Sequence, residues 1–260
     1  MVKGLLLLMA CVLSLSPLTS MGADPIDVHV NVSVGESAEC AILLHGLARS
    51  STSMASMGRA LNAAGFTVAS VDYPSRKHRI GFLSEQAVRA GVDACLDAKG
   101  ERLYVVTHSM GGILIRDYLS RHNVPELTRI VMLAPPNHGS AVVDNVKDVP
   151  GLQWLNGPAF LQLGTDENSL PLQLGPIAVD TAVIAGTISI NLFLSTFLEN
   201  PDDGKVSVES ARLDGMCAML TVPVSHPYIM KDETVIIETL SYLQTGRFSE
   251  PTAEYFDCQS

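Results

Sequence analysis

The chain has 260 residues, of which 47% are hydrophobic, enough for one α/β core without a second domain. Acidic residues outnumber basic ones by 27 to 17, and the formal net charge of −10 disfavours nucleic acid as a partner.

The N-terminal segment has the pattern of a secretory signal peptide. Lys3 provides a basic start, residues 4–15 are apolar, and residues 16–23 are rich in small and helix-breaking residues. We predict that residues 1–23 are removed on export to the periplasm or the medium, and that residues 24–260 form a single domain. In an alternative interpretation, Cys11 belongs to a lipoprotein cleavage site and carries a lipid.

From residue 40 onward, segments typical of strands and helices alternate, which predicts a mostly parallel, doubly wound sheet with helices on both faces. The predicted strands cover residues 40–44, 66–71, 103–106, 130–133, 182–185 and 220–224, and the predicted helices cover residues 53–64, 85–98, 112–122 and 233–243. The apolar run 182–198 is short and contains several polar residues, so we expect no transmembrane span.

The first motif is Leu44-His45-Gly46-Leu47, at the end of an early apolar strand. A loop in this place can present a backbone N–H, here that of Leu47, to an oxygen that gains negative charge during a reaction. We expect the His45 side chain to shape this turn, and we include it among the residues of a substrate pocket.

A basic run, Arg76-Lys77-His78-Arg79, follows the second predicted strand. Such a run is usually a solvated loop. If it lies at the mouth of a site, it would attract an anionic substrate or a lipid head group.

The most informative motif is Thr107-His108-Ser109-Met110-Gly111-Gly112. An apolar strand stops at a serine with small neighbours and then becomes helical, which is the layout of a nucleophile elbow. The serine hydroxyl then stands clear of the sheet, and the N–H of Met110 points at the atom under attack. Thr107 stands where the usual pattern has its first glycine.

Two segments rich in apolar residues, 151–164 and 188–199, stand between the core elements. We predict that they form a small lid. They carry four aromatic residues that we expect to line a pocket for an apolar chain of a substrate, or else to belong to the core: Trp154, Phe160, Phe193 and Phe197.

The five motifs together resemble the serine α/β-hydrolases of the bacterial lipase and esterase type. They are Leu44-His45-Gly46-Leu47, the elbow around Ser109, Ala134-Pro135-Pro136-Asn137-His138-Gly139-Ser140, Asp203-Gly204-Lys205-Val206 and Ser225-His226. The resemblance covers residues 40–243 and implies the α/β-hydrolase fold with a catalytic serine, acid and histidine in that chain order.

Chain order narrows the choice of the base and the acid. Of the three histidines after Ser109, His226 is the one that follows the last predicted strand, where this fold places its general base. Asp203, in an Asp-Gly turn before that strand, is the expected acid, with Asp202 and Glu209 as alternatives.

The expected activity is hydrolysis of a small-molecule or lipid carboxylic ester through an acyl-enzyme on Ser109, with neither metal nor organic cofactor. Peripheral contact with lipid is compatible with this activity. The same triad would serve an acyltransferase, a thioesterase or an amidase. A non-catalytic binding protein on the same scaffold is the alternative from another class.

Four cysteines remain after the signal segment: Cys40, Cys95, Cys217 and Cys258. An oxidising compartment would allow three pairings, whereas the apolar patterns around Cys40 and Cys95 are also typical of buried free thiols. The pairing therefore stays open at this point, and the spacings do not match a zinc site.

Overall fold

The computed structural model describes residues 26–258. The predicted signal peptide and Cys11 lie outside the described residues. Eight strands form one sheet: β1 (His29–Ser33), β2 (Glu39–Leu44), β3 (Thr67–Asp72), β4 (Arg102–His108), β5 (Leu127–Leu133), β6 (Thr181–Gly186), β7 (Ala218–Val222) and β8 (Glu254–Tyr255).

The helices of the described chain follow between these strands. They are η1 (Ser51–Met54), α1 (Ala55–Ala63), α2 (Ile80–Asp97), α3 (Met110–Leu119), α4 (Ala141–Val146), α5 (Leu152–Asn156), η2 (Phe160–Gln162), α6 (Leu170–Gln173), α7 (Leu192–Ser195), α8 (Val208–Ala211), η3 (Ile229–Lys231) and α9 (Glu233–Thr245). Among these elements, no helix is long and apolar enough to cross a lipid bilayer.

The sheet has the strand order β1-β3-β2-β4-β5-β6-β7-β8. The pairs from β3 to β7 are parallel, and the two edge strands β1 and β8 are antiparallel to their neighbours. Parallel pairing is what the alternation of strands and helices predicts. The edge strands were not predicted, because β8 has two residues and β1 is largely exposed.

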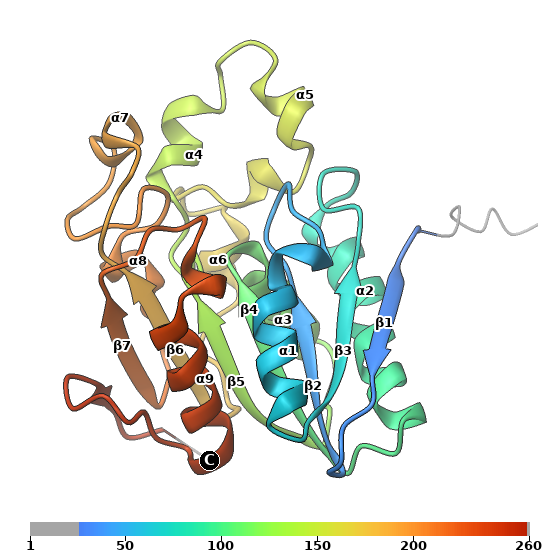
Figure 1. Cartoon of the computed structure of the whole chain (residues 1–260). Coiled ribbons are helices and arrows are strands. Elements are labelled where there is room, and N and C mark those ends of the chain that lie inside the picture. Colours follow the sequence, from blue (N-terminus) through green and yellow to red (C-terminus); the bar gives the residue numbers. More distant parts are fainter. Residues whose placement is uncertain (1–25, 259–260) are drawn as a thin grey trace, which may run out of the picture.

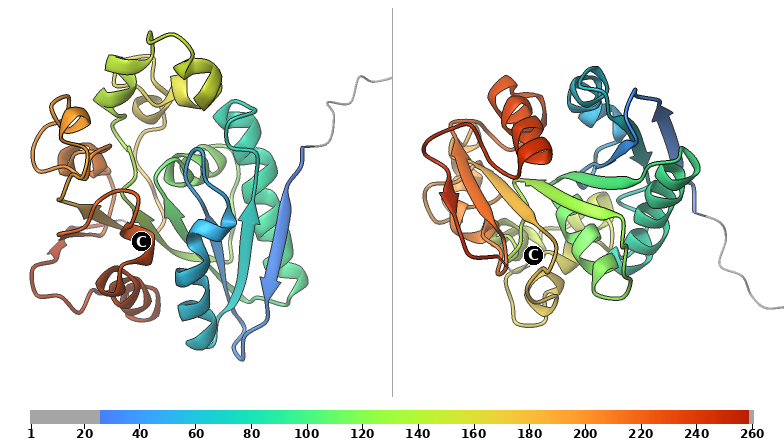
Figure 2. Two further views of the ribbon diagram at one scale, coloured as in Figure 1. Left: turned by 45° about the horizontal axis from the view of Figure 1, so that its top comes forward. Right: turned by 90° about the horizontal axis from the view of Figure 1, so that it is seen from below.

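Helices cover both faces of this sheet, and each face has its own core. Ile42 and Leu44 of β2 face α2 and α3, whereas the alternate residues Ala41 and Leu43 face α1 and α9. Figure 2 shows α1 and α9 together on one side of the sheet in the view from below. A strand buried on both faces reads as a continuous apolar run, which explains why the central strands were easy to predict.

Two helices begin earlier than their patterns predicted. Helix α2 starts at Ile80 rather than at residue 85, since Ile80 and Leu83 are buried in the core and extend its apolar side toward the N-terminus. Helix α3 starts at Met110, directly after Ser109.

Two insertions lie above the carboxyl ends of the strands (Figure 1). The first carries α4, α5 and η2 between β5 and β6, and the second carries α7 between β6 and β7. The segments 151–164 and 188–199 fall within them. Both insertions therefore lie on the edge of the sheet where parallel α/β proteins bind ligands.

The four described cysteines form two disulfides. Cys40–Cys95 ties β2 to α2, and Cys217–Cys258 ties the start of β7 to the C-terminal segment. The structure thus selects one of the three pairings that the sequence left open.

Candidate active site

Ser109 occupies a sharp turn between β4 and α3. Its backbone has φ 53° and ψ −122°, a conformation that a non-glycine residue adopts only where the surrounding structure enforces it. The Ser109 N–H donates to the carbonyl oxygen of Leu133 in β5, and the Ser109 carbonyl oxygen accepts from the N–H of Gly112. These bonds hold the turn at the carboxyl end of β4. Thr107, which replaces the usual glycine, is buried in β4.

Two glycines let other parts of the chain pass close to this turn. A Cβ at Gly111 would lie 2.6 Å from the carbonyl oxygen of Leu44, and a Cβ at Gly46 would lie 3.1 Å from the Cβ of Ser109. The absence of a side chain at both positions relieves these contacts. The loop after β2 therefore runs directly beside Ser109.

Ser109, His226 and Asp203 form one hydrogen-bonded series, although they come from loops after β4, β7 and β6. His226 Nδ1 lies 2.7 Å from Asp203 Oδ2, and His226 Nε2 lies 3.0 Å from Ser109 Oγ. An ionised carboxylate only accepts hydrogen bonds, so the imidazole proton is on Nδ1 and Nε2 is free to accept from the Ser109 hydroxyl. His226 and Asp203 are both buried, at 3% and 1% exposure. Such a series can activate a serine for nucleophilic attack.

The other oxygen of Asp203 is held by the backbone. Oδ1 accepts from the N–H groups of Lys205 at 3.0 Å and of Val206 at 2.8 Å, while the His226 N–H donates to the Asp203 carbonyl oxygen. The carboxylate is therefore fixed in orientation as well as in position.

The two alternative acids lie elsewhere. The Asp202 carboxylate accepts from the Gly204 N–H and from the Ser195 hydroxyl, which ties the acid loop to the segment at α7. Glu209 is exposed and pairs with Arg212 at 3.3 Å. Neither contacts His226.

The backbone N–H groups of Leu47 and Met110 were predicted to face a developing oxyanion. Met110 opens α3, where the first N–H groups have no acceptor within the helix. Across residues 26–258, neither N–H donates to a backbone or side-chain acceptor. Both are therefore available to an oxygen bound beside Ser109.

His45 shapes the loop after β2 from inside the protein. Its ring is fully buried and stacks on Tyr73 with the centroids 3.9 Å apart, and its Nδ1 donates to the Gly46 carbonyl oxygen. Burial lowers the pKa of His45, so the ring is neutral. His45 does not line the cavity at Ser109 described below.

His108 is a buried neighbour of the series that sequence reasoning passed over. Its ring lies 4.8 Å from that of His226, and its Nε2–H donates to the His226 carbonyl oxygen. Burial, together with the nearby His226, holds the pKa of His108 well below its usual range. The His108 ring is therefore neutral, and it packs beside the ring of His226.

A cavity of about 100 Å³ opens at Ser109 and His226. Its apolar lining comes from both the core and the first insertion: Leu47, Pro136, Val142, Val143, Phe160, Leu163 and Val206. Its polar lining consists of Arg49, His108, Ser140, Asn156 and Lys205. A small apolar cavity with a few polar groups suits a small ligand or part of a larger one.

Only one of the four predicted aromatic residues lines this cavity. Phe160 does so; Trp154 is 88% exposed, and Phe193 is 69% exposed and packs edge-to-face on Phe197 at 5.3 Å. Asn156 is the residue of α5 that reaches the cavity, and side chains two positions apart on a helix point to different sides. Trp154 is not part of this cavity but lines the second pocket described next, and Phe197 borders a different hollow with His138.

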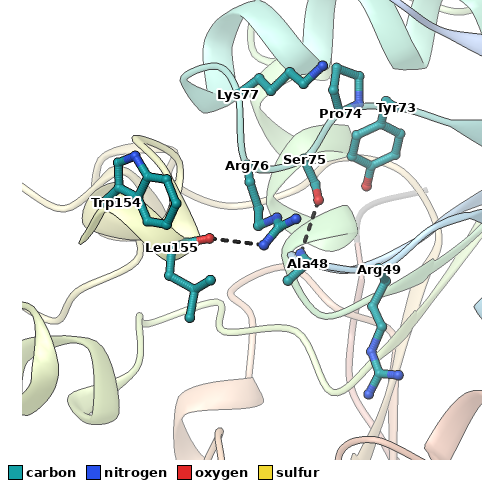
Figure 3. A pocket seen from close by; sticks show the side chains of 9 residues that line it. All are labelled: Ala48, Arg49, Tyr73, Pro74, Ser75, Arg76, Lys77, Trp154 and Leu155. Carbon is teal, nitrogen blue, oxygen red and sulfur yellow. Dashed lines mark hydrogen bonds between the residues drawn. The ribbon is translucent and has the colours of Figure 1, made fainter. Parts of the chain in front are cut away.

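A second pocket, of about 450 Å³, adjoins the first through Arg49, which lines both. Figure 3 shows Arg76 reaching from the loop after β3 toward α5, where its guanidinium donates to the Leu155 carbonyl oxygen at 3.2 Å. In the same loop, the Ser75 hydroxyl accepts from the Ala48 N–H at 3.0 Å. The basic run that begins at Arg76 thus lies beside the candidate active site.

The loop between β5 and α4 is anchored by a buried arginine. Arg116 donates to the Asn137 side chain and to the carbonyl oxygens of Asn137, Pro171 and Gly175. Burial lowers the pKa of Arg116 to about 10. The arginine therefore remains charged at neutral pH, and it fixes the loop that carries Pro136 into the cavity.

In the part of the chain that the structure describes, no three His, Cys, Asp or Glu side chains gather in a way that could hold a metal ion. A model of the alpha/beta hydrolase family matches residues 41–240. No curated protein sequence matches the chain.

Several solved structures share the fold at low sequence identity. The mature lipase BlEst2 of Bacillus licheniformis has a TM-score of 0.66 at 19% identity, covering 85% of this chain and 98% of that one. Lipase B of Aspergillus fumigatus has a TM-score of 0.61 at 16% identity, covering 86% and 57%. A thermophilic esterase from Thermogutta terrifontis has a TM-score of 0.57 at 15% identity, covering 86% and 96%.

Proposed function

The chain belongs to the alpha/beta hydrolase family, and from that premise we propose that it is an exported serine hydrolase that cleaves carboxylic esters. The observation that carries the proposal is the uninterrupted series from Ser109 Oγ through His226 to Asp203. Ser109 lies in the strained turn expected of a nucleophile, beside a cavity large enough for part of a small ester.

In the proposed mechanism, Ser109 Oγ attacks the ester carbonyl carbon while His226 Nε2 takes the hydroxyl proton. Asp203 stabilises the imidazolium that forms, and the N–H groups of Leu47 and Met110 stabilise the tetrahedral oxyanion. His226 then gives its proton to the leaving alkoxide. Water attacks the acyl-enzyme by the same route and releases the acid.

The substrate class is proposed from the cavity and from the structural neighbours. The apolar wall with Phe160 suits a short acyl chain, and several neighbours of the same fold are titled lipases or esterases. The same triad would also serve thioesters, amides or acyl transfer, but no contact in the cavity favours one of these.

Export is proposed from two features. Residues 1–23 have the composition of a signal peptide, and two disulfides in a small domain are typical of an oxidising compartment. We propose residues 24–260 as the mature domain, with segments 151–164 and 188–199 as its lid.

Labelling with a fluorophosphonate, combined with hydrolysis of 4-nitrophenyl butyrate, tests this function. The wild type should be labelled once, and Ser109→Ala should lose the label and roughly three or more decades of kcat while staying folded. Ser140→Ala is the matched control, because its hydroxyl lines the same cavity but donates to the Lys205 carbonyl oxygen instead of to a base. A label that persists in Ser109→Ala would remove Ser109 from the mechanism.

A further inference from the structure

Two basic side chains line the cavity at Ser109. Arg49 comes two residues after Leu47, and Lys205 comes two residues after Asp203, so each charge is attached to one of the loops that build the site. Within residues 26–258, neither side chain forms an ion pair with a carboxylate or donates a hydrogen bond to another group. Both side chains are exposed to solvent.

Several other basic residues of this acidic protein form ion pairs with carboxylates. Arg89 and Arg121 share Glu85, and Arg129 pairs with Asp180 at 2.9 Å. With a net charge of −10, carboxylates are abundant, so two unpaired cations in one small cavity are not explained by a shortage of partners.

The two cations are also close enough to act on each other. Partial desolvation by the cavity walls lowers the pKa of Lys205, the charge of Arg49 lowers it further, and Asp203 opposes both effects. Two like charges held together in this way are unfavourable unless an anion joins them. The Asp203 carboxylate offsets part of this repulsion, but within residues 26–258 neither cation has a carboxylate partner in an ion pair.

The positive region continues into the second pocket. Arg49 lines both the cavity at Ser109 and the second pocket, and Arg76 and Lys77 also line the second pocket (Figure 3). The Leu155 carbonyl oxygen holds the Arg76 guanidinium in place but leaves its charge uncompensated. An anion at Arg49 would therefore be attracted from both sides.

We propose that the ester substrate carries a negatively charged group, a carboxylate or a phosphate, which Arg49 and Lys205 bind beside Ser109. This inference rests on the proposed ester hydrolysis and specifies the class of its substrate. Arginine binds either group with two parallel N–H donors, and lysine adds a point charge. The charged group would place the ester carbonyl at Ser109, and the apolar wall would accept the uncharged part.

Matched esters that differ in charge test the proposal and locate the anion. For an anion on the acyl side, the monomethyl esters of succinic, glutaric and adipic acid are compared with methyl butanoate, pentanoate and hexanoate. For an anion on the alcohol side, dihexanoyl phosphatidic acid is compared with dihexanoylglycerol. The measured quantity is the ratio of kcat/KM for the charged ester to kcat/KM for its neutral match.

The wild type should favour the charged ester in one of the two sets. Arg49→Gln and Lys205→Gln should each lower the ratio by roughly tenfold, as expected for loss of one charge-assisted contact. The ratio in the wild type should also fall as ionic strength rises, which requires no variant to fold. Lys99→Gln removes the same charge at the opposite edge of the sheet, after α2, and should leave the ratio unchanged.

Three results would overturn the inference: no preference for charge in either set, a preference that survives both substitutions, or an equal loss for charged and neutral esters. The last result would mean that the cations act on the developing oxyanion of any ester. Each of these leaves ester hydrolysis intact, whereas hydrolysis of neutral esters that persists in Ser109→Ala contradicts the proposed function itself.

Discussion

Replacing Asp203 by asparagine removes a negative charge and, in this structure, also reverses the hydrogen-bond polarity of the series. The N–H groups of Lys205 and Val206 hold one side-chain oxygen of Asp203, so the amide oxygen of asparagine should take that place. The NH₂ group then faces His226 Nδ1, which can only accept from it. The imidazole proton moves to Nε2, and the ring no longer accepts the proton of Ser109.

The expected loss follows from this wrong tautomer. Asp203→Asn should lower kcat by about 10⁴-fold, which corresponds to about 5 kcal/mol of transition-state stabilisation. The substitution is close to isosteric and keeps both backbone contacts, so the folded state should persist. Steady-state hydrolysis of 4-nitrophenyl butyrate measures the loss, and thermal unfolding followed by circular dichroism checks the fold.

Asp202→Asn is the matched control at the adjacent position. The Asp202 carboxylate accepts from the Gly204 N–H and the Ser195 hydroxyl, contacts that an amide can largely replace. Its kcat should stay within a few-fold of the wild type. The reasoning is refuted if Asp202→Asn is the more damaging change, or if folded Asp203→Asn keeps more than about a tenth of the activity.

Phe160→Ala should flatten the rise of kcat/KM with acyl chain length, because each buried methylene contributes about 0.8 kcal/mol. If Phe160→Ala and the exposed control Phe193→Ala give the same dependence on chain length, Phe160 does not line the acyl-binding part of the cavity. Gly111→Ala should lower the free energy of unfolding by about 1–3 kcal/mol, since its Cβ would lie 2.6 Å from a carbonyl oxygen of β2; an unchanged urea midpoint would show that the elbow tolerates a side chain. Replacing Cys40 and Cys95 by serine should cost about 4 kcal/mol in urea unfolding for a loop of this length, with a sequence separation of 55; a cost below about 1 kcal/mol would contradict the chain-entropy estimate.

The elements nearest the candidate site were predictable because their signals are local. The elbow at Ser109 is a strand, a turn and a helix in one continuous segment, and the buried strands beside it read as apolar runs. His226 could be selected because it follows the last of these strands. Chain order thus pointed to Ser109 and His226 before any distance was known.

Choosing among the acids required distances across the fold. Asp202 and Asp203 are adjacent, and both belong to the same turn, so no pattern separates them. In the folded protein, the Asp203 carboxylate is held by the Val206 N–H and contacts His226, whereas the Asp202 carboxylate accepts from the Ser195 hydroxyl.

The aromatic residues of the two predicted lid segments show the limit of composition as a guide. Trp154 and Phe193 are apolar, yet both are largely exposed; Trp154 lines the second pocket, and neither side chain lines the cavity at Ser109. They lie on α5 and α7, which have five and four residues. Helices this short show too few turns for the apolar side to be identified from spacing.

By itself, the sequence determined the order of the parallel strands and of the four longest helices, the turn that exposes Ser109 and the histidine that follows the last parallel strand, because each depends on neighbours within a few residues. Only the tertiary structure decided the acid, the disulfide pairing, the place of Phe160 in the cavity wall and the presence of Arg49 and Lys205 in one cavity. These features join residues far apart in the chain, and their contacts are set by how the loops pack above the sheet, which no local pattern of residues encodes.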